Sequence, residues 1–123
     1  MGYARYALDA LDRALAKEVG TTVIVRRIVA GSPVDANCRA SVRSYGMRDD
    51  PLRPSSEQAQ DEIHVIISPT DLASSGWPGS STGPSYPQRG DFIVIRGLSR
   101  VIEVVDPIYI DDELVRIEIR ATG

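Results

Sequence analysis

The chain has 123 residues, the usual size of a single domain, and we expect residues 1–123 to form one. Its formal net charge of -3 at pH 7 gives no reason to expect a general affinity for nucleic acid from bulk electrostatics. One cysteine and one histidine exclude an internal disulfide and the usual cysteine- or histidine-rich zinc sites. The first residues lack the apolar run of a secretory signal, and no stretch approaches the ~20 apolar residues of a membrane span. We therefore expect a soluble protein made inside the cell.

The first predicted element is an amphipathic helix over residues 3–19. Its apolar residues recur at spacings of three and four and fall on one stripe: Ala4, Leu8, Leu11, Leu15 and Val19. Charged residues mostly cover the other side, and Gly20 gives the stop signal. A helix with a single apolar stripe must bury that stripe against a sheet or against a partner subunit.

After this helix the apolar period falls to two, which predicts strands. Residues 21–29 are rich in β-branched side chains, and residues 31–33 are predicted to turn the chain. A second strand is predicted over residues 36–45, where buried and polar positions alternate. Residues 46–61 are polar and proline-containing, so we expect a long mobile loop there.

A short apolar strand over residues 63–67 leads into a short predicted helix over residues 69–75. Ser68 suits the N-cap and Pro69 suits the first turn. Residues 76–90 are dominated by glycine, serine and proline, a composition that forms neither strand nor helix. We expect this second long loop to gain its order only against neighbouring subunits.

The last third of the chain predicts three strands, over residues 91–96, 101–105 and 113–120. Tight turns are expected at Gly97 and at Asp111-Asp112, and Asp106-Pro107 is expected to close or bend the middle strand. In the final strand the predicted inward side chains are Val115, Ile117 and Ile119, and the outward ones are Leu114, Arg116, Glu118 and Arg120. The predicted fold class is mainly β: a small antiparallel β-barrel or sandwich of about six strands, with an N-terminal α-helix and long loops.

Residues with the chemistry for catalysis or metal binding are few and isolated. His64 is interpreted as a partly exposed strand residue opposite the core face, and Cys38 as a small buried hydrophobe. The acidic residues between positions 106 and 113 lack the spacing of a calcium loop. The Arg-Gly-Asp tripeptide at residues 89–91 matches an adhesion motif and equally fits a turn that opens a strand. We predict no enzyme activity, no cofactor and no metal site.

The two predicted loops hold the candidate interface residues. Trp77 is the only tryptophan, and it is interpreted either as a local anchor that pins its loop onto the barrel or as an anchor in a protein interface. The two roles are compatible with each other. The full set of interface candidates is Trp77, Tyr86, Arg89, Arg48 and Arg53.

Three segments carry a resemblance to a known family. The first is the strand and turn from Pro87 to Gly97, followed by the strand from Val101 to Pro107. The others are the N-terminal helix that leads into the strand from Thr22 to Arg27, and the run from Ile67 to Pro78. Together they resemble the head-tail joining proteins of tailed bacteriophages, which include head-completion, stopper and neck proteins.

The resemblance implies a structural protein of the virion neck, assembled in the host cytoplasm, which forms a ring of about six or twelve copies below the portal. The ring would join the capsid to the tail and line or close the channel through which double-stranded DNA passes. Its partners would be the portal or adaptor protein on one side and the tail or tail-terminator protein on the other. Residues 46–61 and 76–89 would be the loops that contact neighbouring subunits.

Two other functions stay open at this point. One is a nucleic-acid-binding barrel of the oligonucleotide-binding type, which needs stacking aromatic residues and a basic groove. The aromatic residues of this chain are few and scattered, which argues against it. The other is a tail-terminator or tail-completion protein, because the sequence does not decide the position within the neck.

Overall fold

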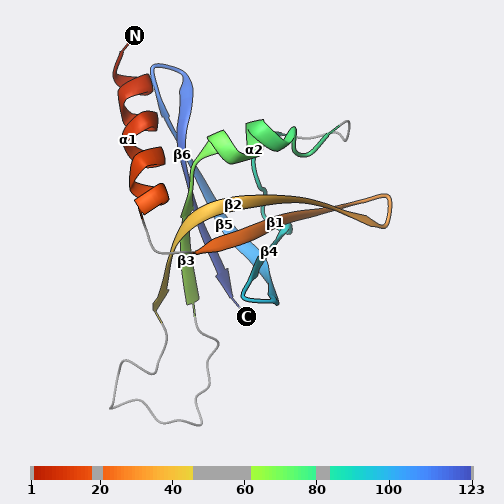
Figure 1. Cartoon of the computed structure of the whole chain (residues 1–123). Coiled ribbons are helices and arrows are strands. Elements are labelled where there is room, and N and C mark those ends of the chain that lie inside the picture. The colour runs from red at the N-terminus through yellow and green to blue at the C-terminus, as the bar shows by residue number, and fades with distance from the viewer. Residues whose placement is uncertain (1, 18–20, 46–61, 80–83, 123) are drawn as a thin grey trace, which may run out of the picture.

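The computed structural model describes residues 2–17, 21–45, 62–79 and 84–122. Its elements in chain order are α1 (Tyr3–Lys17), β1 (Thr22–Val29), β2 (Ser32–Tyr45), β3 (Glu62–Ile67), α2 (Pro69–Ser75), β4 (Phe92–Ile95), β5 (Leu98–Ile110) and β6 (Glu113–Thr122). The strands pair antiparallel and close into a barrel in the order β1-β2-β3-β6-β5-β4 (Figure 1). The predicted mainly β fold, with six strands and an N-terminal helix, is confirmed as a barrel.

Alternating side chains from the strands fill the inside of the barrel. In β6 the predicted inward residues Val115, Ile117 and Ile119 are all buried. Burial of one such aliphatic side chain stabilises the fold by roughly 1.5–3 kcal/mol. The outward prediction for Leu114 is wrong: this side chain is partly buried and packs against the core, because the start of β6 lies against α1.

Three hairpins turn through two residues, and both residues of each turn have positive φ: Ala30-Gly31, Arg96-Gly97 and Asp111-Asp112. Positive φ at both positions is the type I′ geometry, which matches the twist of the flanking strands. The turns at Gly97 and at Asp111-Asp112 are confirmed. The first turn was predicted at residues 31–33 and lies earlier, so β2 begins at Ser32 and includes Pro33.

The short helix α2 follows the prediction closely. The Ser68 hydroxyl accepts a hydrogen bond from the Thr70 backbone N–H at 3.1 Å, and Pro69 lies in the first turn. Gly76 ends the helix with a left-handed φ of 72°. For the N-terminal helix, the predicted last turn up to residue 19 lies outside the described residues.

Strand β5 differs most from the prediction. It runs from Leu98 to Ile110 and passes through Pro107, where the sequence predicts an end or a bend. Pro107 pairs with Ile117 of β6, while β4 pairs with β5 only as far as Val101. The proline is accommodated because no strand in the described ranges pairs with the other side of β5 there, so no ladder among them needs its missing N–H.

Two hairpins extend beyond the closed part of the barrel, and each lies beside one helix. The far part of the β5–β6 hairpin lies along α1, and the β1–β2 hairpin lies against α2 (Figure 1). They project in different directions, so the molecule presents two separate extensions of its sheet.

Candidate assembly interface

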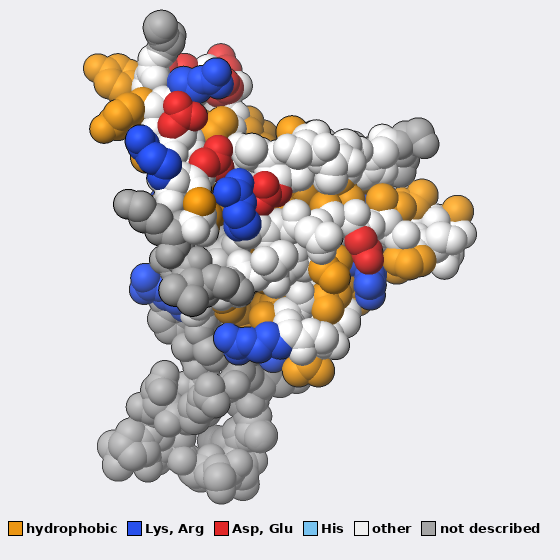
Figure 2. Space-filling model, viewed as in Figure 1, with side chains coloured by type: hydrophobic (Ala, Val, Ile, Leu, Met, Phe, Trp, Pro, Cys, Tyr) orange, Lys and Arg blue, Asp and Glu red, His pale blue; other side chains and the backbone are white. Residues whose placement is uncertain are grey.

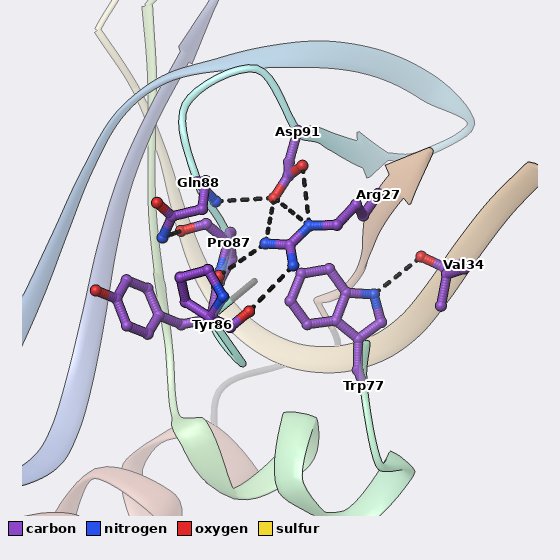
Figure 3. A network of polar contacts seen from close by, with 8 residues as sticks. Arg27, Val34, Trp77, Tyr86, Pro87, Gln88 and Asp91 are labelled. Carbon is purple, nitrogen blue, oxygen red and sulfur yellow. Dashed lines mark hydrogen bonds and ion pairs between the residues drawn. The ribbon is translucent and has the colours of Figure 1, made fainter. Parts of the chain in front are cut away.

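Arg27 is the centre of a buried polar cluster, which we call the latch. It occupies an inward position of β1, in the alternation that follows Val23 and Val25, and only 9% of it is exposed. Its guanidinium donates to both carboxylate oxygens of Asp91, with nitrogen–oxygen distances from 2.9 to 3.3 Å. It also donates to the backbone carbonyls of Pro84, at 3.0 Å, and Tyr86, at 3.1 Å (Figure 3). The latch thereby ties β1 to the segment that precedes β4.

Trp77 completes the latch from a third direction. Its ring lies beneath the Arg27 guanidinium, whose central carbon is 4.6 Å from the ring centroid. Its indole N–H donates to the Val34 carbonyl of β2 at 2.9 Å. Because Trp77 is only 4% exposed, the interpretation as a local anchor is confirmed. The interpretation as an interface anchor stays a prediction, and the ring surface of Trp77 already packs within the core of its own chain.

Asp91 is held as tightly as its partner. Its carboxylate accepts a hydrogen bond from the Gln88 backbone N–H at 2.8 Å, and its own backbone bonds to Gln88 and Ile102. Asp91 is the acid of the Arg-Gly-Asp tripeptide, and it is 9% exposed. Since an adhesion contact needs a free carboxylate, the tripeptide is a turn that opens β4.

The latch also corrects the expectation for the second long loop. Residues 76–79 and 84–90 form no strand or helix, as predicted, yet their described part is fixed by the chain's own β1 and β2. No neighbouring subunit is needed, because a buried arginine supplies donors to the loop carbonyls. The first predicted loop, residues 46–61, lies outside the described residues.

Residues 27–39 of the β1–β2 hairpin, which we call the arm, pair with β1 and β2 residues alone in the part of the chain that the structure describes. Strand β4 reaches β1 only as far as Arg26, and β3 joins β2 only from Ala40. The base of the arm is supported by the latch and by α2, where Asp71 accepts a hydrogen bond from the Arg39 backbone N–H at 2.8 Å. The arm is therefore a rigid projection with open strand edges toward its end.

The end of the arm is apolar and exposed. Its residues 28–33 carry no charge, and Ile28 is 48% exposed. Figure 2 shows hydrophobic side chains at the surface of this projection. Just behind this tip, Arg26 and Asp35 form an exposed two-bond ion pair at 2.8 and 3.0 Å. The hydrogen bond from Arg26 lowers the pKa of Asp35, so the pair stays ionised near neutral pH. The arm therefore has an uncharged tip and, just behind it, the charged pair Arg26 and Asp35, which we call the collar.

A groove of about 450 Å³ lies between α1, α2 and the start of β6, and we call it the α1–α2 groove. It is lined by uncharged residues: Leu8, Pro69, Thr70, Ala73, Ser74 and Leu114. The Thr70 hydroxyl donates to the Asp12 carboxylate at 2.8 Å and so ties the two helices together beside the groove. This surface is shallow and open to solvent, and it is uncharged, with the hydroxyl groups of Thr70 and Ser74 beside its apolar side chains.

A second, larger hollow of about 570 Å³ lies on the outer face of β2, β3, β5 and β6. Its charged residues alternate in sign: Arg43, Asp106, Arg116, Glu118 and Arg120. Arg116 approaches Glu118 at 2.9 Å, and Arg120 approaches Glu62 at 3.5 Å. His64 lies on this face, partly exposed as predicted, with its ring 3.6 Å from Glu62. Three arginines and two acids line the hollow, and two of the arginines lie close to a carboxylate, so its basic character is weak.

The remaining reactive side chain is Cys38. It is 1% exposed on the inner face of the arm, which confirms its interpretation as a small buried hydrophobe. Burial, reinforced by the negative charge of Asp71, raises the pKa of its thiol to about 12. Across the ranges that the structure describes, no three potential metal ligands gather in one place. The same ranges contain no helix long and apolar enough to cross a bilayer.

Two of the other predicted interface residues, Tyr86 and Arg89, lie in the described part of the second loop. Tyr86 is partly buried, and its side chain meets that of Tyr109; Arg89 is exposed in the turn before β4. Arg48 and Arg53 lie outside the described residues. Sequence reasoning missed Arg27 and the arm tip. A signal for Arg27 was present, because an arginine at an inward strand position needs a buried acid.

Comparison of the chain with protein-family models, with curated proteins and with solved structures finds no match.

Proposed function

We propose that this chain is a structural assembly protein of a phage-type head-tail interface, which acts as a ring-forming neck, head-completion or stopper subunit. The single observation that carries the proposal is the arm: a rigid projection whose uncharged tip exposes Ile28 to solvent. Ile28 and its uncharged neighbours through Pro33 form a contiguous exposed surface, and contiguous apolar surfaces are typical of protein interfaces. The resemblance of the sequence to head-tail joining proteins supports this particular assembly.

Other exposed apolar side chains support an assembly role. Besides Ile28, the described residues expose Tyr3, Tyr6, Leu98, Val101, Val104 and Tyr109. Tyr3 and Tyr6 are three residues apart on α1 and are 79% and 70% exposed, which makes them the most exposed of the set. Apolar contact area of this kind, distributed over several faces, suits a subunit that touches neighbours on more than one side.

In this proposal the ring contains about six or twelve copies and belongs to the virion neck, between portal or adaptor and tail or tail-terminator proteins. Double-stranded DNA passes through it without being held. A net charge of -3 and a mixed-sign outer face suit a channel on which DNA slides. The subunit would act by position and contact, without catalysis or a cofactor.

A nucleic-acid-binding barrel is the second candidate, and the outer face of the barrel favours it. Three arginines, Arg43, Arg116 and Arg120, line the hollow on that face. Against it, two of the three approach a carboxylate of a neighbouring residue, and no described tyrosine or tryptophan lines the hollow to stack on a base.

Two measurements on the purified chain separate the candidates. Native mass spectrometry and electron microscopy across a concentration series should show ring-shaped oligomers, or a monomer that enters rings only with portal or tail proteins. Fluorescence anisotropy with single-stranded DNA at about 0.15 M salt should show no tight binding. Tight DNA binding that is lost in Arg43→Ala, from a protein that forms no ring under either condition, would replace the first candidate by the second.

A further inference from the structure

We infer that the arm tip of one copy inserts into the α1–α2 groove of a second copy, and that this contact builds the oligomer. The inference rests on the proposed function and names the partner surface for it. The tip consists of residues 28–33, and the groove is lined by Leu8, Leu114 and their uncharged neighbours.

The first argument is chemical match. Neither the tip nor the lining of the groove contains a charged side chain. Two other hollows, on the outer face of the barrel and between α1 and the β5–β6 hairpin, are lined in part by charged residues, including Arg116 and Glu118 in both. An apolar tip placed there would strip water from charges without replacing their hydrogen bonds. The α1–α2 groove receives the tip without this cost.

The second argument is hydrogen bonding. A two-residue turn leaves the backbone N–H groups of its central residues, here Ala30 and Gly31, outside the hairpin ladder. The hydroxyl oxygens of Thr70 and Ser74 in the groove lining can accept hydrogen bonds from such donors.

The third argument is geometry. The arm passes α2 and its end points away from α1 in Figure 1, so the tip is directed away from the α1 side of the groove in its own chain. The contact must join two different surfaces on two copies. In an open head-to-tail oligomer, the first copy has an unused groove and the last copy an unused tip, or the reverse. If the rotation between neighbouring copies is suitable, these two ends meet and the oligomer closes into a ring.

A disulfide trap tests this contact. The double variant Ser32→Cys with Ser74→Cys places one thiol on the tip and one on the groove lining, both at exposed serines. Cys38 is buried, so we expect its thiol to form no disulfide in this assay. Under mild oxidation we expect a ladder of disulfide-linked multimers, whereas each single variant stays monomeric on a non-reducing gel. The matched control, Ser32→Cys with Ser99→Cys, places the second thiol on exposed β5 and should give no ladder.

A second variant provides an independent readout. Ile28→Asp should weaken self-association by about tenfold or more, with unchanged unfolding by urea, because a charge would enter the uncharged groove. Ser99→Asp, at an exposed serine in another hairpin, should leave association unchanged. Rings that form without the ladder and survive Ile28→Asp would overturn the inference while the proposed function stands. A chain that neither self-associates nor enters rings with portal or tail proteins would overturn both.

Discussion

The β1–β2 and β5–β6 hairpins have similar backbones but end in side chains of different chemistry. Both extend beyond the closed barrel, both turn through two residues with positive φ, and each lies against one helix. The β5–β6 hairpin ends in the acidic turn Asp111-Asp112, which suits contact with water. The arm ends in uncharged residues around Ile28, which suits contact with protein. Side-chain composition at the tip, more than backbone architecture, separates a solvent-facing projection from a binding one.

The two hairpins also differ in how they are held. The β5–β6 hairpin lies against α1, and apolar residues from both, including Leu11 and Ile110, line the space between them. The arm is fixed at its base by the directional contacts of Arg27 with Asp91 and Trp77. Apolar contacts tolerate small shifts, whereas a two-pronged ion pair fixes one geometry. A projection that must enter a groove on another copy gains from the second kind of support.

The largest effect is expected at the latch. Asp91→Ala leaves the Arg27 guanidinium buried without its acid, which should lower the free energy of unfolding by about 3–5 kcal/mol. Urea denaturation measures this directly. The buried Cys38 thiol gives a local readout, since labelling by a thiol reagent should speed up as the arm opens. Asp35→Ala, which breaks the exposed pair with Arg26, is the matched control and should cost far less. Equal losses in the two variants would show that the latch does not fix the arm.

A smaller effect on stability is expected from a variant that replaces Trp77 by an aromatic residue without an N–H group. Trp77→Phe removes the hydrogen bond to the Val34 carbonyl and weakens the contact with Arg27. The expected loss is about 1–3 kcal/mol in free energy of unfolding. Ring assembly should persist because the arm tip is untouched. Stability unchanged from that of the unaltered protein would mean that the indole only fills space.

A gain in stability is expected at the turn of the arm. Ala30 has a φ of 52°, which alanine adopts poorly, and Gly31 follows it. Ala30→Asn creates the Asn-Gly pair preferred in type I′ turns and should raise the free energy of unfolding by about 0.5–1 kcal/mol. Asp112→Gly creates the Asp-Gly pair at the other hairpin and should give a similar gain. If only one of the two stabilises the protein, the hairpins do not share the same turn geometry.

The smallest effect concerns pH at the collar of the arm. The Arg26 hydrogen bond lowers the pKa of Asp35 below its ordinary value of 3.8, so the ionised carboxylate favours the folded state. This contribution is present above the pKa of the unfolded chain and is lost as pH falls through the lower folded pKa. A carboxyl-carbon NMR titration should show the lowered value. Urea denaturation between about pH 5 and pH 2 should show a steeper loss for the unaltered protein than for Asp35→Asn.

The sequence allowed most of the fold to be predicted, because local signals were strong. Alternation in β6, the Ser68 cap and the Gly97 turn each specify their structure from a few neighbouring residues. Strand ends were less accurate. Pro33 and Pro107 suggested breaks, yet both lie inside strands, since each strand lacks a second partner at that point. The absence of a neighbouring strand is a tertiary fact that no local window contains.

The candidate site was much harder to predict. Its central pair, Arg27 and Asp91, is separated by 64 residues. The composition of residues 76–90 indicated a loop without order of its own, while Arg27 from a distant strand supplies that order in the described part. The sequence predicted Trp77 as a local anchor for its loop. Its burial could not be predicted, because it depends on the positions of β2 and of the latch around the ring.

By itself the sequence determined which segments become strands and helices, because period, caps and turn residues act over a few positions. Only the tertiary structure decided where the arm leaves the barrel, which loop is fixed and which apolar residues remain outside. Those features depend on where a strand lacks a neighbouring strand and on where buried charged side chains meet. Both are properties of the closed barrel as a whole.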